Sequence, residues 1–168
     1  MNTSKIITLA IASLVSISIM LMVVQLLILK LKPKSETDGK IKLSYGIWFS
    51  SLFISATIIT SKSILVLSEA LDNIYKFNLQ NTVLESAKIT SFYIGSAMVW
   101  FVAWVYIASF LTKMICGKRI NANEIEVDNY SYFLIRGMML IGLIFCSMPV
   151  FEIMIRLFIP SIEIPFYH

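Results

Sequence analysis

Few side chains within the apolar stretches of this sequence could do chemistry, and most of them recur at helical spacing. Polar residues follow one another at intervals of seven, four, seven and seven, in the order Ser44, Ser51, Ser55, Lys62 and Glu69. At 100° per residue these intervals keep all five within about 40° of one another on a helix. They form one polar stripe, which could contact an anion or a partner helix, because polar faces of apolar helices normally point toward protein rather than lipid.

A related stripe follows at an offset of 85 residues, as Asn129, Arg136 and Ser147. Arg136 lies about 9 Å along a helix that begins near residue 130, at 1.5 Å per residue. From that depth a long side chain can return its guanidinium to the membrane surface, toward Asp128, Glu126 or a lipid phosphate. Two interpretations are open, a snorkelling anchor and a contact inside the bundle with an anion or a partner helix. We expect the snorkelling anchor.

A further pair of charges lies near the end of the same apolar region. Glu152 and Arg156 are spaced i, i+4, in the order that is favourable on a helix. An exposed pair of this kind contributes little stability. We expect Glu152 to be an interfacial anchor rather than a proton carrier.

Motifs for catalysis and metal binding are missing from the sequence. There is no HExxH, no GxSxG and no P-loop, and the single histidine is His168. Cys116 and Cys146 belong to no CxxC or Cys/His spacing. The basic residues lie in short connections without a nucleic-acid-binding module. We therefore expect no enzymatic activity, no cofactor, no metal and no nucleic-acid partner.

The composition indicates which elements must position these residues. The chain is 58% hydrophobic and 14% charged, with a mean hydropathy of +0.82, unlike a soluble domain. A helix needs about 20 apolar residues to cross a membrane, and four uncharged stretches approach or exceed that length. The sequence predicts an all-α integral membrane protein, a single transmembrane domain over residues 1–168. Its four helices are expected in a compact bundle, at about 6–29, 43–67, 82–113 and 130–158.

The two halves of the sequence share an order of features. Residues 11–13 (IAS) recur 83 positions later as residues 94–96 (IGS). KIKLSY ahead of the second helix corresponds to EIEVDNY ahead of the fourth. We interpret these as two tandem two-helix units, at about 6–75 and 89–159. Because each unit crosses the membrane twice, an axis along the membrane normal would relate them.

This arrangement resembles the bacterial YjfL-type inner-membrane proteins of unknown function. The residues that carry the resemblance are Glu124-Ile125, Asp128-Asn129 and Gly137 in the second half, with Lys40-Ile41 and Ser44 in the first. The resemblance implies four helices in a bacterial inner membrane, with a place in envelope stress or defence. It implies no defined activity.

Basic residues in the short connections predict the orientation. The first connection holds five lysines and the third holds Lys113, Lys118 and Arg119, against fewer on the opposite side. Lysine and arginine favour the cytoplasm, so loops 1 and 3 are expected there and both termini outside. Loop 1 would also attract anionic lipid headgroups, at about 1 kcal/mol per basic residue.

Two functions from different classes remain open. The first is a non-catalytic multi-pass inner-membrane subunit that assembles with itself or with other proteins, in envelope stress, immunity or defence. The alternative is a small transporter or oligomeric ion channel that uses the polar stripe of the second helix with Arg136. Four close-packed helices leave no lumen, so conduction would need an oligomer. We favour the assembling subunit.

Overall fold

The computed structural model of the protein describes residues 3–29, 31, 36–37, 39–76 and 82–159. Within these ranges four long helices are each long and apolar enough to cross a membrane. They are α1 (Thr3–Ile28), α2 (Leu43–Lys76), α3 (Thr82–Cys116) and α5 (Tyr130–Arg156). The predicted all-α fold with four candidate spans is therefore confirmed.

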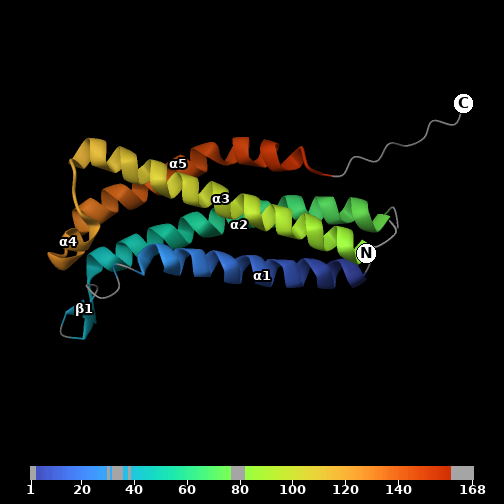
Figure 1. The fold of residues 1–168 in the computed structure, drawn as a ribbon, viewed down its shortest axis with the longest axis horizontal. Helices are drawn as coiled ribbons and strands as arrows, with labels where there is room; N and C mark the ends of the chain where they lie inside the picture. The colour runs from blue at the N-terminus through green and yellow to red at the C-terminus, as the bar shows by residue number, and fades with distance from the viewer. Residues whose placement is uncertain (1–2, 30, 32–35, 38, 77–81, 160–168) are drawn as a thin grey trace, which may run out of the picture.

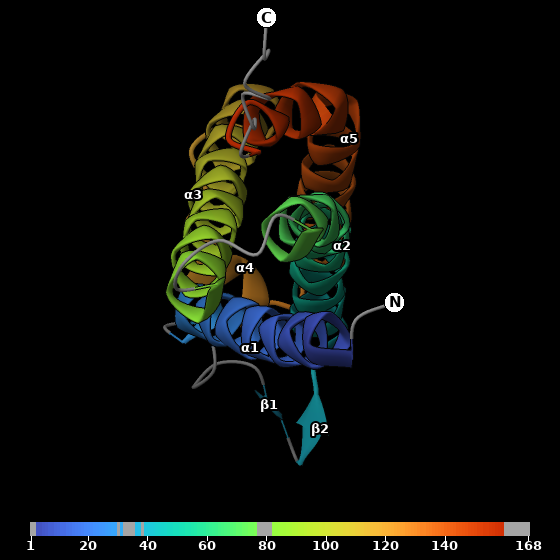
Figure 2. The same cartoon turned by 90° about the vertical axis from the view of Figure 1, so that its right-hand side faces the viewer.

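The four helices lie side by side along the long axis of the molecule (Figure 1). α2 and α5 run in one direction, and α1 and α3 run in the other. α2 packs against α1, α3 and α5. Seen from the end where the N-terminus lies, α2 stands between α1 and α5, and α3 lies along their side (Figure 2). α2 is thus the central helix, which places its polar stripe where other helices can cover it.

Three short elements lie at the opposite end of the bundle from the start of α1 and the end of α5 (Figure 1). Strands β1 (Glu36–Thr37) and β2 (Lys40–Ile41) form an antiparallel pair, and α4 (Asn121–Glu126) precedes α5. A single turn or two of helix is unstable alone, so α4 depends on tertiary contacts. Ile125 of α4 is fully buried, and the Tyr132 hydroxyl lies 3.1 Å from Asn121 Oδ1.

Local signals account for the helix ends at this side of the bundle. α3 ends at Cys116, and Gly117 follows with a φ of +79°, the left-handed conformation that commonly terminates a helix. α5 begins where the Asn129 side chain accepts a hydrogen bond from the Tyr132 backbone N–H, at 3.3 Å. Pro149 lies inside α5, and the helix continues past it to Arg156.

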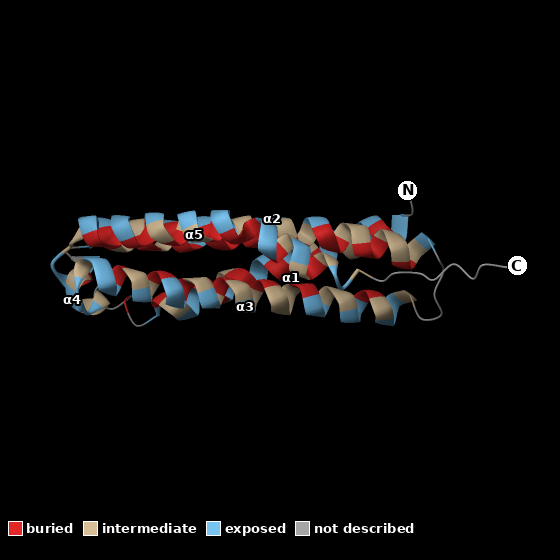
Figure 3. Ribbon diagram, turned by 90° about the horizontal axis from the view of Figure 1, so that it is seen from above, coloured by how far each residue is buried: buried red, intermediate tan, exposed pale blue. Residues whose placement is uncertain are grey.

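Burial separates an inward from an outward face on every long helix. Buried positions face the interior, and exposed positions cover the outside (Figure 3). Leu52, Phe101 and Phe133 are fully buried, whereas Leu14 and Phe145 are among many large apolar side chains on the outer surface. An apolar exterior of this extent is typical of a surface that faces lipid.

The helix boundaries differ from the sequence expectation chiefly in α2, which ends at Lys76 rather than near residue 67. After residue 67, Ala70, Leu71 and Ile74 continue the helical period and are buried against the bundle. α3 runs three residues farther than predicted, and α5 ends at Arg156 rather than 158. The two repeat units remain a prediction.

Candidate functional site

The polar stripe of α2 faces α5. Ser44, Ser51 and Ser55 are all buried. Near the start of both helices, a Cβ added to Gly137 of α5 would lie 2.0 Å from Ser51 Oγ. Only glycine fits there, because no side-chain atom can approach a neighbour that closely. Small residues on both helices therefore bring the two backbones together, as in other membrane helix interfaces.

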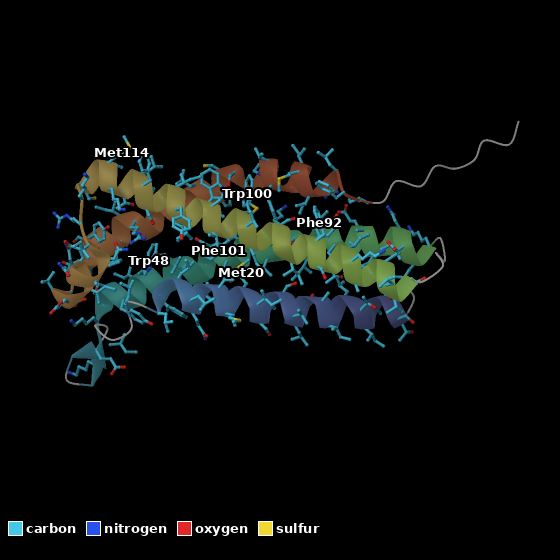
Figure 4. The ribbon with its side chains drawn as sticks, in the orientation of Figure 1. Met20, Trp48, Phe92, Trp100, Phe101 and Met114 are labelled. Carbon is cyan, nitrogen blue, oxygen red and sulfur yellow. The ribbon has the colours of Figure 1, made fainter. Side chains whose placement is uncertain are left out.

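Arg136 lies inside the bundle beside this close contact. Arg136 as a whole residue is only 6% exposed. Nη2 donates a hydrogen bond to Ser109 Oγ of α3 at 2.6 Å, and Cζ lies 4.0 Å from the centroid of the Trp48 ring of α2. Trp48 lies toward the end of the bundle that carries α4 (Figure 4). The guanidinium is thus covered by three helices.

The prediction that Arg136 snorkels to the surface is therefore wrong. The depth estimate allowed snorkelling but said nothing of neighbours on other helices. Because Gly137 lets α2 approach, the Trp48 ring reaches the guanidinium and offers an attraction of about 2 kcal/mol or more when desolvated. A hydrogen bond to a charged group adds about 1.5–3 kcal/mol. Together these offset the cost of an arginine within a span, which is at most roughly 2.5–3.5 kcal/mol on insertion scales, the value for the centre of the membrane.

The charge of Arg136 has no acidic partner within the described ranges of the chain, where no carboxylate lies within ion-pair distance of it. Its Nε is buried and has no hydrogen-bond partner there. A ring and a hydroxyl hold this buried cation, and no counter-charge supports it. Loss of either contact should therefore destabilise the charged side chain in the bundle.

A second polar cluster joins α2 and α5 nearer the termini. Lys62 Nζ lies 3.1 Å from Glu152 Oε2, and Glu152 Oε1 lies 2.9 Å from Arg156 Nη2. Arg156 also makes two hydrogen bonds to Glu69, one of them at 3.0 Å between Nη2 and Oε1. The four side chains alternate in sign along the contact. Lys62 thus ends in an ion pair, and the sequence-predicted isolated pair of Glu152 and Arg156 is part of a larger network.

A third cluster holds the start of α2 at the α4 end. Asp128 Oδ1 accepts a hydrogen bond from the Ser44 backbone N–H at 2.9 Å, and Lys42 Nζ donates to the Glu126 carbonyl oxygen at 2.9 Å. The Ser44 hydroxyl faces the same carboxylate but lies outside hydrogen-bond geometry. The Ser44 side chain and its backbone N–H lower the pKa of Asp128 below its ordinary value. Asp128 therefore caps α2 from another part of the chain.

The structure separates the seven predicted site residues into different environments. Ser44 and Asn129 lie at helix starts, where they take part in capping. Ser55 Oγ is buried and has no hydrogen-bond partner among the residues that the structure describes, and Ser147 Oγ donates to the carbonyl oxygen of Ile144. Ser51 and Arg136 belong to the close contact of α2 and α5 at Gly137, and Lys62 lies about 16 Å farther along α2 at 1.5 Å per residue. They do not converge on one site.

Sequence reasoning missed Trp48 and Ser109 as partners of Arg136. Trp48 stands one helical turn from both Ser44 and Ser51, so its place on the stripe could have been read from spacing. Ser109 carries no such signal, because its closeness to Arg136 depends on how α3 packs.

The chemistry that these clusters can perform is binding and positioning of helices. Among the described residues no group of three His, Cys, Asp or Glu side chains could hold a metal ion. Cys116 and Cys146 are free thiols, and His168 lies outside the described residues. Comparisons of the chain with protein-family models, curated proteins and solved structures found no match. The resemblance to YjfL-type proteins remains a prediction.

Proposed function

We propose that this protein is a non-catalytic multi-pass subunit of a bacterial inner membrane that assembles with itself or with another membrane protein. The observation that carries the proposal is a second stripe on α2, formed by Ser50, Thr57 and Ser61. Intervals of seven and four place them on one face, about 100° from the buried stripe. All three are exposed.

This outer stripe borders an open groove between α1 and α2. The groove has a volume of 360 Å³, with Thr57 and Ser61 on one wall and Ile17 and Met20 on the other. Small hydroxyl residues on a membrane-facing surface let another helix approach closely and can hydrogen-bond across the contact. An exposed face of this kind fits a helix from a second subunit better than it fits lipid.

Packing of the buried polar stripe of α2 favours assembly over transport. A small transporter or oligomeric ion channel that uses this stripe with Arg136 needs an open path beside it. Ser51 instead presses against Gly137, and Lys62 pairs with Glu152. A path through a single chain would have to separate α2 from α5 and expose these groups.

Crosslinking in membranes tests the proposal. A photo-crosslinking amino acid at Ser61 should give a discrete product, at twice the mass of the chain for self-assembly or at another fixed mass for a membrane partner. The matched control places the same amino acid at Phe145, which is exposed on α5. Equal crosslinking at both positions, or none at Ser61, would contradict assembly through this face. Ion flux in liposomes tests the transporter alternative on the same preparation.

The proposed orientation, with loops 1 and 3 in the cytoplasm, has its own test. Lys118→Cys lies in the third connection and Leu157→Cys follows α5, and both positions are exposed. In a chain with Cys116→Ala and Cys146→Ala, a membrane-impermeant thiol reagent on spheroplasts should label only Leu157→Cys. Labelling of Lys118→Cys alone would reverse the orientation.

A further inference from the structure

A small groove opens between the last turn of α1 and the first turns of α2, at the end of the bundle that carries α4. Its volume is 290 Å³, and two polar and three apolar side chains line it: Gln25, Tyr45, Ile28, Leu29 and Phe49. The connection that joins these two walls contains the β1–β2 hairpin, which lies at the same end (Figure 1). The groove beside Ser61 lies about 18 Å farther along α2 and is a separate feature.

Gln25 brings an unpaired polar group to this groove. It is the only amide side chain of α1, and it is exposed. The hydroxyls of Ser16 and Ser18 donate to carbonyl oxygens of their own helix, so they need no outside partner. The Gln25 amide has no hydrogen-bond partner among the described residues. Contact of this amide with hydrocarbon is unfavourable, so it requires a polar group from outside the chain.

Polarity changes along the α2 wall in the same order as along a phospholipid. Lys42 directly precedes the helix, Tyr45 lies about 5 Å farther in, and Phe49 lies about 11 Å in, at 1.5 Å per residue. On the α1 wall, Gln25 lies about 5 Å before the end of the helix. The amide and the phenol are therefore at similar depths, between the basic connection and the apolar part of the span.

The connection between the two walls supplies positive charge. It holds five lysines and only two acidic residues. Lys42 donates to the Glu126 carbonyl oxygen and lies beside Asp128, which takes up part of its charge. Lys40 is exposed and forms no ion pair within the described ranges. Lys40 is therefore the basic group of β2 that can meet an anion.

Apolar side chains alternate with these two lysines. Ile41 is 66% exposed and Leu43 is 58% exposed. Exposed apolar residues that flank lysines are typical of a segment in the membrane surface, where the lysines reach phosphates and the apolar side chains enter the lipid. A soluble anion would leave Ile41 and Leu43 uncovered, whereas a lipid covers both and also supplies the negative charge.

We propose that the groove between the end of α1 and the start of α2 binds one anionic phospholipid. Lys40 contacts its phosphate, and Lys42 adds positive charge beside it. Gln25 and Tyr45 donate hydrogen bonds to the ester or phosphate oxygens, and the acyl chain lies along Phe49. The lysines select an anionic over a zwitterionic lipid, at about fivefold per lysine, which corresponds to about 1 kcal/mol.

Single substitutions separate the charge from the hydrogen bonds. Lys40→Gln removes one exposed charge, and its matched control is Lys118→Gln, which is exposed in the connection between α3 and α4. Tyr45→Phe removes the phenol hydroxyl, and its control is Tyr106→Phe, which is exposed on α3. Gln25→Leu removes the amide and keeps an apolar side chain of similar length.

Native mass spectrometry of the full chain in detergent measures the affinity of the first bound lipid. The chain is titrated with phosphatidylglycerol or with phosphatidylethanolamine of identical acyl chains. The wild type and both controls should bind phosphatidylglycerol roughly five- to 25-fold tighter. Lys40→Gln should weaken phosphatidylglycerol about fivefold and leave phosphatidylethanolamine unchanged. Gln25→Leu and Tyr45→Phe should each weaken both lipids about fivefold, the effect of one hydrogen bond.

Three results would overturn the proposal. Equal weakening by Lys40→Gln and Lys118→Gln would indicate diffuse attraction to a basic surface without a site. Equal affinities of the wild type for the two lipids would mean that no anion is recognised. Displacement of phosphatidylglycerol by the same concentration of inorganic phosphate would mean that a soluble anion is sufficient. Assembly through the groove beside Ser61 is measured by crosslinking, so its failure is a separate result.

Discussion

The guanidinium carbon of Arg136 lies 4.0 Å from the centroid of the Trp48 ring, where a carboxylate would be the usual neighbour of a buried arginine. The ring attracts the cation without itself carrying a charge, so neither group needs a second ion to be brought into the membrane. The contact joins α5 to α2 at the point where Gly137 and Ser51 bring their backbones together. Packing and charge stabilisation at this point therefore depend on each other.

The first prediction is that Trp48 and Arg136 are energetically coupled. Trp48→Leu should destabilise the bundle by about 3–5 kcal/mol in the wild type, from lost packing and the lost ring contact. In an Arg136→Leu background the same change should cost about 1–2 kcal/mol less, because no buried cation is left exposed to hydrocarbon. Reversible unfolding in detergent micelles measures all four corners of the cycle. Additive effects would show that the ring does not stabilise the charge.

The second prediction concerns the close approach of α2 and α5. Gly137→Ala places a methyl group where Ser51 Oγ already lies, so the helices must separate. We expect a loss of about 1–3 kcal/mol in the free energy of unfolding, as for other overpacked interfaces. Ser51→Gly in the same chain should recover part of this loss. The control is Gly142→Ala, which has open space and should change stability little.

How far the sequence predicts this protein depends on the range of the interaction. Four apolar helices and the inward face of α2 follow from composition and spacing, because both are local properties of the chain. Burial of Ser51 and Ser55 agrees with that face. The predicted position of the Arg136 side chain was wrong, because its true position depends on two residues of other helices. These are Trp48, 88 positions earlier in the sequence, and Ser109.

The short elements and the charge network were missed for a similar reason. α4 and the β1–β2 pair are too short to be stable by themselves, so no periodic pattern marks them. The partners Glu69 and Arg156 are 87 residues apart, and Lys62 and Glu152 are 90 apart. α2 and α5 run in the same direction, which keeps such pairs at a nearly constant offset along the contact (Figure 1).

The third prediction is a dependence of stability on pH that arises at Asp128. Interaction with Ser44 lowers the pKa of this carboxyl in the folded protein. A lowered folded-state pKa means that its stabilisation is fully present above the unfolded pKa of about 3.9 and is lost as the pH falls through the folded value. The protection factor of the amides in the first turn of α2, which is their exchange relative to the intrinsic rate at the same pH, should therefore fall on acidification below about pH 4. Asp128→Asn should remove that fall, and an unchanged dependence of protection on pH in this variant would contradict the role of Asp128.

The fourth prediction ranks the members of the charge network. Arg156 contacts two carboxylates, Glu69 and Glu152, whereas Lys62 contacts one. Exposed ion pairs contribute little each because solvent screens them, so Arg156→Met, which removes two pairs, should destabilise the bundle more than Lys62→Met, which removes one. Methionine keeps the length of the side chain and removes its charge. Unfolding in detergent at low and high salt measures both variants, and salt should reduce the difference between them because the pairs are partly exposed. If Lys62→Met were the more damaging change, the network would not be held together through Arg156.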